Sequence, residues 1–249
     1  MTTTPDTTSP WTVFAAGAIA REEPRQDAPV VQRFDPGYQL FGTYHVNADT
    51  DEEWIALDQE DGPAFLPRWT VNRVHPGNRV DGDIPVGTAK VDRWWGLPVV
   101  YEPSDLAPVP EEWKYEPTRD YPLRREALHA LLDMLAAARH EGIEIRVASA
   151  YRPGKYQQDL YERAIARDGA AQRYSAPPGH SEHQLGTCVD LTDPPGRHCL
   201  KESFNDTPQG QWLAQNAARF GFKRSYFPEN TQETGYISEP WHWRYWGRP

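Results

Sequence analysis

The sequence predicts two folded parts: a small all-β region near the amino terminus, followed by a region in which helices and strands mix. Three observations predict this fold class. Short apolar and β-branched segments separated by turn signals fill residues 11–74. Residues 75–122 then hold 8 of the chain's 24 prolines. After Pro122, helical and strand-like spacings of apolar residues alternate.

The first part begins with residues 1–10, mostly Thr, Pro and Ser, a composition typical of a disordered lead. Residues 11–74 predict a small β-barrel domain, because short strands recur between turns. The expected strands cover residues 30–34, 38–46, 54–57 and 65–74. The expected turns lie at Asp-Pro-Gly (35–37), the acidic run 49–53 and Glu-Asp-Gly (60–62).

Residues 75–110 predict an extended connector. Trp94 and Trp95 interrupt its prolines, so we expect it to pack on its neighbours through aromatic side chains instead of forming a free linker. The boundary of the second domain is expected near residue 110, and residues 111–249 form that domain.

The sequence pattern of the second domain predicts alternating helices and strands. Apolar residues at helical spacing from Leu123 to Leu135 predict a helix that Gly142 ends. Thr207 and Pro208 predict the cap and first position of another helix, which ends at Gly221. A further helix is expected over residues 154–168, and strands over 143–147, 188–191, 222–226 and 241–246.

Composition and charge exclude several classes of protein. The 249 residues include 10 Trp, 12 Tyr and 8 Phe, enough aromatic mass for a folded core. The net charge is −10; residues 1–110 carry 8 basic and 17 acidic side chains, and residues 111–249 carry 18 and 19. Neither half has the basic surplus of a nucleic-acid binder. No apolar run approaches the roughly 18 residues of a membrane span.

The first residues predict no secretory signal, because the apolar run 13–20 is short and lacks a basic lead; either export uses another route, or a signal has been trimmed, or the protein stays inside the cell. Cys188 and Cys199 lie 11 residues apart. Either they form a disulfide in an oxidising compartment or both are unpaired thiols, and two cysteines do not decide between these alternatives.

Three segments carry residues suited to chemistry, namely 149–157, 179–190 and 239–245. His183, Asp190 and His242 supply two imidazoles and a carboxylate, a set that suits Zn²⁺ with a fourth position for water. Gly186 allows the chain to turn from His183 into the strand that ends at Asp190. The three side chains could therefore converge from separate segments.

Two further residues fit a hydrolase. Glu239 lies three residues before His242, and Pro240 breaks the strand alternation between them, so both side chains could face one site. A carboxylate beside metal-bound water is the usual general base of such an enzyme. Arg152 begins a loop after a strand, where a fixed guanidinium can bind a carboxylate or a developing oxyanion. Each residue alone has an ordinary structural explanation, but the joint pattern favours a metal site.

The motifs resemble a known family. Ser-x-His-x(6)-Asp at 181–190, Glu-Pro-Trp-His at 239–242 and Tyr-Arg-x-x-x-Tyr-Gln at 151–157 are similar to the zinc D-Ala-D-Ala carboxypeptidases of the VanY type and the related L,D-carboxypeptidases of the LdcB type. The resemblance covers about residues 110–247. It implies an α+β domain with a small antiparallel sheet bearing the site, flanking helices, and one Zn²⁺ per chain.

The resemblance also implies roles for individual residues. His183, Asp190 and His242 would be the zinc ligands. Glu239 would be the catalytic base, and Arg152 would steady the substrate carbonyl. The implied substrate-binding residues are Ser181, Gln157, Tyr151 and Trp241.

The implied activity is removal of the C-terminal D-alanine from peptidoglycan stem peptides, in the cell envelope, periplasmic or extracellular. The alternatives are an L,D-carboxypeptidase acting on tetrapeptides, a lysin-like endopeptidase, and a non-enzymatic cell-wall-binding module. Pro153 stands where the family often has Ser, and Cys188 where it often has Ala. These departures do not affect the implied metal ligands, but they leave undecided which stem peptide is the substrate.

Residues 11–74 resemble a bacterial SH3-like domain. The order of an Arg-x-x-Pro segment at 21–24, a Val-Val to Pro-Gly stretch at 30–37 and Trp-Ile-Ala-Leu at 54–57 carries this resemblance. Such domains often bind cell-wall peptides, so the resemblance implies a wall-binding role. The alternative is a packing or spacer domain.

Overall fold

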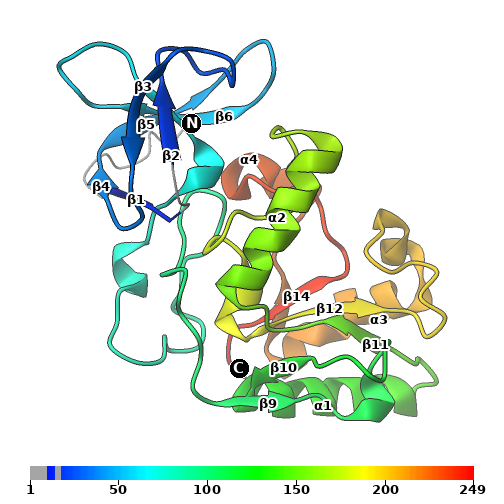
Figure 1. The fold of residues 1–249 in the computed structure, drawn as a ribbon. Coiled ribbons are helices and arrows are strands. Elements are labelled where there is room, and N and C mark those ends of the chain that lie inside the picture. Colours follow the sequence, from blue (N-terminus) through cyan, green and yellow to red (C-terminus); the bar gives the residue numbers. More distant parts are fainter. Residues whose placement is uncertain (1–9, 15–17) are drawn as a thin grey trace. The chain divides into compact units, whose positions relative to one another are not determined.

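A computed structural model describes residues 10–14 and 18–249, and the chain divides into two compact units (Figure 1). Unit 1 comprises Met1–Arg79, Lys90–Val100 and Gly154–Ser181. Unit 2 comprises Val80–Ala89, Tyr101–Pro153 and Glu182–Pro249. The disordered lead expected at residues 1–10 lies, apart from Pro10, outside the described residues. The expected domain boundaries at residues 74 and 110 stay predictions.

Unit 1 contains two sheets of short antiparallel strands, with strand orders β4-β1-β8 and β3-β2-β7-β6-β5. The strands are β1 (Trp11–Val13), β2 (Ala18–Arg21), β3 (Val30–Phe34), β4 (Gln39–Leu40), β5 (Gly42–Val46), β6 (Glu53–Leu57), β7 (Phe65–Pro67) and β8 (Val71–Asn72). Strands β3 to β8 lie at the segments in which strands were expected, whereas no expected strand covered β1 or β2. Closure into a barrel and the SH3-like identity stay predictions.

The strand expected over residues 38–46 is in fact two strands, because the chain changes sheets at Phe41. β4 pairs with β1, whereas β5 pairs with β6. Gly42 permits this change, since a Cβ there would lie 2.4 Å from the carbonyl oxygen of Ala56. The strand expected over residues 65–74 is likewise divided into β7, a 3-10 turn and β8.

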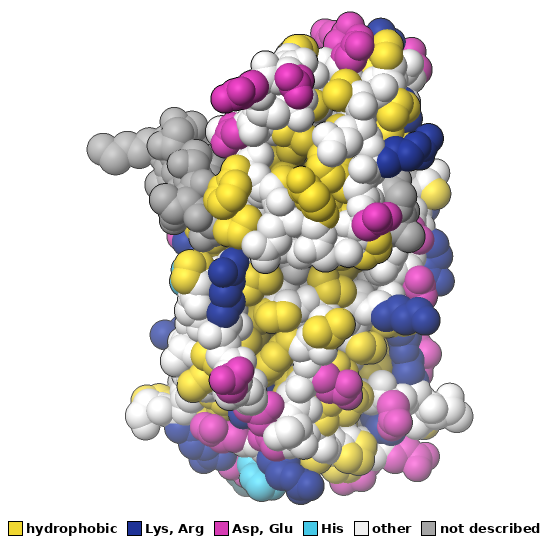
Figure 2. All heavy atoms as spheres, turned by 60° about the vertical axis from the view of Figure 1, so that its left-hand side comes forward, with side chains coloured by type: hydrophobic (Ala, Val, Ile, Leu, Met, Phe, Trp, Pro, Cys, Tyr) yellow, Lys and Arg dark blue, Asp and Glu magenta, His cyan; other side chains and the backbone are white. Residues whose placement is uncertain are grey.

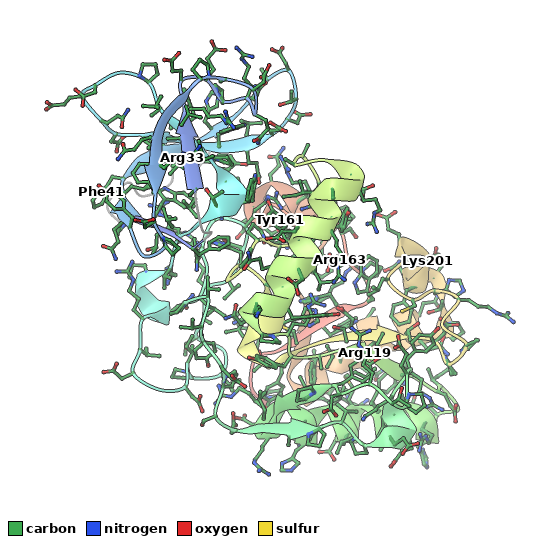
Figure 3. The ribbon with its side chains drawn as sticks, in the orientation of Figure 1. Arg33, Phe41, Arg119, Tyr161, Arg163 and Lys201 are labelled. Atoms are coloured by element: carbon green, nitrogen blue, oxygen red, sulfur yellow. The ribbon has the colours of Figure 1, made fainter. Side chains whose placement is uncertain are left out.

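Helix α2 (Gly154–Asp168) belongs to unit 1 and has the bounds that the sequence predicted. Gln157, Tyr161 and Ala164 are buried at helical spacing, while Arg163 is exposed (Figure 3). The amphipathic pattern therefore explains how this helix packs within its unit.

Unit 2 is built on an antiparallel sheet with strand order β11-β12-β14-β13, accompanied by a β9-β10 hairpin. The strands are β9 (Leu106–Pro108), β10 (Pro122–Arg124), β11 (Arg146–Ser149), β12 (Cys188–Thr192), β13 (Phe222–Arg224) and β14 (His242–Tyr245). The helices are α1 (Arg125–His140), α3 (Pro208–Asn216) and the short α4 (Thr231–Thr234). The expected mixed fold with an antiparallel sheet is confirmed.

Two helix ends in unit 2 follow from local chemistry. The Thr207 hydroxyl accepts a hydrogen bond from the Gly210 N–H at 3.0 Å, which caps α3 as expected. After α1, Gly142 adopts a positive φ, and the Ile143 N–H donates to the Ala138 carbonyl at 2.9 Å. Because Ile143 takes part in this cap, β11 begins at residue 146 and not at residue 143.

The sheet of unit 2 has one apolar face and one polar face. Side chains alternate along each strand, so residues two apart share a face. Its apolar residues pack in one core with Leu131 and Leu135 of α1; these are Val147, Val189, Leu191, Trp243 and Tyr245. The intervening residues Cys188, Asp190, His242 and Arg244 face the other way. The hydrophobic core thus fixes which side chains the sheet offers on its second face.

Acidic and basic side chains are interspersed with hydrophobic ones on the face shown in Figure 2.

Within residues 10–14 and 18–249, every helix is too short or too polar to cross a lipid bilayer.

His180 is a fully buried histidine of unit 1 that must stay neutral. Its Nδ1 lies 2.9 Å from the Asp92 carbonyl oxygen, which only accepts, so Nδ1 carries the hydrogen. Its Nε2 then accepts from the Arg68 guanidinium at 3.1 Å and the Arg73 N–H at 3.4 Å. Burial, reinforced by Arg68, lowers the pKa of His180 well below 6.5.

We expect this histidine to make folding sensitive to mild acid. Below pH 6.5 His180 binds a proton in the unfolded chain but stays neutral in the folded chain, so the free energy of unfolding falls as the pH drops. From pH 7.5 to 5.5 the contribution of His180 is about 1.4 kcal/mol. Urea unfolding at both pH values should show a smaller pH-dependent loss for His180→Gln than for the wild type. The exposed His129→Gln variant is the control, and an unchanged pH dependence in His180→Gln would contradict the assignment.

Candidate metal centre

The polar face of the sheet brings three predicted ligands together. Asp190 on β12 and His242 on β14 are directly opposite each other in the antiparallel register. His183 comes from the 3-10 turn η4 (Glu182–Leu185), whose end is set by Gly186 with φ +70°. The His183 carbonyl also accepts from the Arg152 N–H at 3.3 Å, which ties the turn to the end of β11.

The donor atoms of His183, Asp190 and His242 lie within 4.8 Å of one another, and all three residues are buried. Asp190 Oδ1 is 3.2 Å from His183 Nε2 and 3.2 Å from His242 Nδ1. The other nitrogen of His183, Nδ1, lies 2.6 Å from the Ala150 carbonyl oxygen and therefore donates to it. The Nε2 lone pair of His183 is thus directed toward Asp190 and His242.

The charge states of His183 and Asp190 suit metal ligation, whereas Asp190 and Glu182, against the effect of burial, raise the pKa of His242 well above 6.5, so this ring must release a proton when a metal binds. Burial, together with the nearby Arg152, lowers the pKa of His183 to about 4, which keeps this imidazole neutral at pH 7. Burial alone would raise the pKa of Asp190, but His183 and His242 hold it well below its usual value. Arg152 lies 3.6 Å from Asp190 Oδ2 and donates to the Ser149 hydroxyl at 2.9 Å. Asp190 is therefore an ionised carboxylate in a fixed position.

Glu239 lies beside this cluster. Its Oε2 is 3.8 Å from His242 Nδ1, and its side chain is 12% exposed. The backbone holds it in place, because its N–H donates to the Tyr226 carbonyl and its carbonyl accepts from the His242 N–H. Burial, opposed by His242, raises the pKa of Glu239 to about 8. A carboxyl group with a pKa near neutrality can both accept and release a proton.

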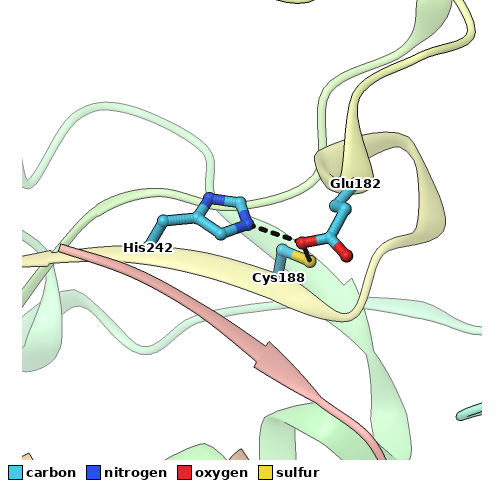
Figure 4. Close-up of side chains that lie close together, drawn as sticks. All are labelled: Glu182, Cys188 and His242. Carbon is cyan, nitrogen blue, oxygen red and sulfur yellow. Dashed lines mark hydrogen bonds and ion pairs between the residues drawn. The ribbon is translucent and has the colours of Figure 1, made fainter. Parts of the chain in front are cut away.

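A second cluster lies on the opposite side of the His242 ring. Glu182 and Cys188 offer an oxygen and a sulfur near His242 Nε2 (Figure 4). Glu182 Oε2 is 2.9 Å from that nitrogen, and Glu182 Oε1 accepts from Arg244 at 2.6 Å. Arg244 lowers the pKa of Glu182 to about 2 against the effect of burial, so this carboxylate is also ionised.

Glu182 and Arg244 had no predicted role. One feature of the sequence could have indicated a role for Arg244: side chains alternate along a strand, so residues 242 and 244 share a face of β14. The contact with Glu182 depends on the turn η4 and on a strand register that no spacing in the sequence reveals.

Comparison with known proteins identifies the family of this chain. The model of the family described as VanY, D-alanyl-D-alanine carboxypeptidase, matches residues 120–248. The chain belongs to the VanY family. These residues include all three candidate ligands and Glu239.

Two named proteins of the comparison are similar in sequence to this VanY family member. The putative carboxypeptidase YodJ of Bacillus subtilis is 37% identical over 165 residues, which are 64% of this chain and 60% of that protein. A D-alanyl-D-alanine carboxypeptidase of Enterococcus faecalis is 38% identical over 128 residues, 47% of this chain and 46% of that protein. The chain thus spans less than two thirds of the length of either relative.

Two solved structures share the fold over 64% of this chain. The LdcB LD-carboxypeptidase matches with a TM-score of 0.59 and 35% identity over 75% of its own chain. A vancomycin-resistance D,D-pentapeptidase VanY variant in complex with Zn(II) matches with a TM-score of 0.52 and 32% identity over 87% of its chain.

The residues predicted to bind substrate in this VanY family member lie in different places. Tyr151 follows β11 in unit 2, and its N–H donates to the Pro122 carbonyl at 3.0 Å. Trp241 is 8% exposed and packs in the hydrophobic core. Gln157 and Ser181 are buried residues of unit 1, and Gln157 donates to the Ala176 carbonyl. Their substrate-binding roles stay predictions.

The two cysteines are free thiols, which answers the alternative that the sequence left open. Cys188 is fully buried on the polar face of β12, and burial raises the pKa of its thiol to about 11. Cys199 is partly exposed.

We expect the native protein to show one reactive thiol. Reaction with an aromatic disulfide reagent at pH 8 should modify Cys199 in the native protein and Cys188 only after unfolding, because burial raises the pKa of both thiols but only Cys188 is inaccessible to the reagent. Cys199→Ser should remove the reactive thiol. Absence of both thiols from unreduced, unfolded protein would contradict the free-thiol state.

Proposed function

We propose that this VanY family chain is a zinc-dependent peptidoglycan peptidase that removes the C-terminal D-alanine from stem peptides. One observation carries the proposal: a buried His-Asp-His donor set has the carboxyl group of Glu239 3.8 Å from one of its nitrogens. A protein that only binds the cell wall has no need of such a proton acceptor. The catalytic machinery is therefore the better explanation of this arrangement.

The donor set fits Zn²⁺. His183, Asp190 and His242 would hold one ion through two nitrogens and one oxygen, a combination that zinc prefers. The outer nitrogens of both imidazoles are already held by acceptors, Ala150 and Glu182, so the inner nitrogens are directed at one point. A Zn²⁺ ion in this site supplies Lewis acidity, which makes water acidic near neutral pH and stabilises negative charge on a carbonyl oxygen.

The protein's own groups supply proton transfer and charge stabilisation. Glu239 accepts a proton from a water molecule while the oxygen of that water bonds to the carbon of the terminal amide. Glu239 then delivers the proton to the amine of the departing D-alanine as the C–N bond breaks. The Arg152 side chain is 21% exposed beside Asp190, where its guanidinium can stabilise charge on the substrate. Ser181, Gln157, Tyr151 and Trp241 are the proposed residues that position the terminal residue.

The comparisons favour D,D-carboxypeptidase activity and supply one alternative. VanYB has been solved in complex with D-alanine-D-alanine and matches 64% of this chain with a TM-score of 0.52. The LdcB structure, an LD-carboxypeptidase, has a TM-score of 0.59. That likeness supports an L,D-carboxypeptidase as the second candidate. A peptidoglycan substrate places the enzyme in the cell envelope, and we propose that residues 11–74 form an SH3-like domain that binds the wall.

Incubation with defined muropeptides tests the activity. We expect the protein to shorten a pentapeptide by one alanine, as measured by mass spectrometry. A chelator should abolish the reaction and added Zn²⁺ should restore it, because the donor set needs the metal. Loss of alanine from a tetrapeptide only would favour the L,D-carboxypeptidase. Cleavage into larger fragments would indicate an endopeptidase, and no cleavage at all would indicate a binding module.

Glu239→Gln tests the proton acceptor. The amide keeps the shape of the side chain but cannot accept the proton, so we expect a loss of about 10²–10⁴-fold in kcat. Zinc content, measured by atomic absorption, should stay at one ion per chain because Glu239 is not a ligand. Full activity at unchanged zinc content would contradict the assignment.

A further inference from the structure

We propose that Glu182, held by Arg244, is a positioning residue that fixes the orientation and tautomer of His242 for metal binding. This inference rests on the proposed metal site, and it adds a residue that acts through a ligand without contacting substrate. It arises from the second cluster on the far side of the His242 ring (Figure 4).

The geometry defines the tautomer of His242. A neutral imidazole carries one hydrogen, on either Nδ1 or Nε2. Glu182 Oε2 lies 2.9 Å from Nε2, and an ionised carboxylate only accepts, so the hydrogen is on Nε2. Asp190 Oδ1 is also an acceptor and lies 3.2 Å from Nδ1, so a metal ion bound between these two atoms would take the place of the Nδ1 hydrogen while Nε2 keeps its own. The carboxylate therefore presents the metal-binding nitrogen of this ring to the centre.

The two candidate ligand histidines are held in opposite tautomers. His183 donates from Nδ1 to the Ala150 carbonyl and offers Nε2, whereas His242 donates from Nε2 to Glu182 and offers Nδ1. A charged carboxylate makes the second imidazole the more basic ligand, since it stabilises positive charge that develops on the ring. The ring of Tyr226 also packs on His242 with centroids 4.9 Å apart, which limits its rotation.

Arg244 gives Glu182 a fixed position. Its guanidinium donates to Glu182 Oε1 at 2.6 Å and to the Ala89 carbonyl at 2.8 Å, and both charged side chains are at most 4% exposed. The β-sheet sets this contact, because Arg244 stands two residues after His242 on the same face of β14. A buried carboxylate with a buried counter-charge is held more rigidly than a solvated one.

The same contacts argue against Glu182, Cys188 and His242 as the metal site. Metal binding at His242 Nε2 would break the hydrogen bond to Glu182. It would also place a metal cation close to the buried Arg244 guanidinium, which already pairs with Glu182, and buried like charges repel. The set with Asp190 and His183 needs no such rearrangement.

The test measures the zinc dissociation constant at pH 7.5 by competition with a chromophoric chelator, on protein shown to be folded by circular dichroism. We expect Glu182→Ala to weaken zinc binding by about 100-fold and Glu182→Gln by about tenfold. The amide oxygen of glutamine still accepts from Nε2, so it should rescue part of the affinity. If Glu182→Ala does not fold, the near-isosteric Glu182→Gln carries the test alone.

Two controls separate this role from others. Glu229→Gln removes an exposed carboxylate, and Cys188→Ala removes the neighbouring thiol. Both should leave the zinc dissociation constant within about twofold of the wild type. If Glu182→Gln lowers thermal stability but leaves zinc affinity unchanged, Glu182 is only structural and the proposal is overturned. If Cys188→Ala abolishes zinc binding while His183→Ala keeps it, the metal occupies the other cluster and the proposal is also overturned.

Failure of the proposed function would look different. D-alanine release by the wild type is measured separately from zinc affinity. A wild type that binds zinc, shows the Glu182 effect and releases no D-alanine would refute the activity while supporting the positioning role.

Discussion

The antiparallel pairing of β12 with β14 is the constraint on which the rest of the site depends. It places Asp190 opposite His242 and Cys188 opposite Arg244. The register is held by the other face of the sheet, where Val189 and Trp243 pack in the core. A slip of one residue would exchange the faces, burying charged groups against α1. The packing of the hydrophobic core and the convergence of the candidate metal ligands are therefore two consequences of one register.

Charge balance explains why so polar a face can be buried. Asp190 lies between two imidazoles and close to Arg152, and Glu182 lies between His242 and Arg244. Each ionised carboxylate thus has a cationic partner and at least one hydrogen-bond donor, as buried charges require. The pairing makes the centre stiff, since moving any one group would leave its partner buried without compensation. Stiffness of this kind keeps a metal site organised before its ion arrives.

The sequence predicted the parts of this site that lie in contiguous motifs. His183, Asp190 and Glu239 stand in short segments whose residue types and spacing indicate metal chemistry. The contact between Glu182 and Arg244 joins positions 62 residues apart, so only the strand register reveals it. In unit 1, the division of the strand at Phe41 was hidden for a similar reason. The apolar alternation continues through it, and only the change of pairing partner shows the break.

Unit 1 shows a deeper reason why sequence patterns are incomplete. Arg93 is fully buried and pairs with Glu53 through two bonds of 2.5 and 2.7 Å, and it also donates to the Gln172 carbonyl. Arginine is mostly found at protein surfaces, so its residue type alone would predict an exposed position for Arg93. Here it joins segments that are distant in the sequence, and burial of Glu53 is tolerated because Arg93 lowers the pKa of that carboxyl group. A small unit made of short strands has limited apolar surface to bury. The buried Arg93–Glu53 pair joins two such segments, and the hydrophobic periodicity of the sequence does not reveal it.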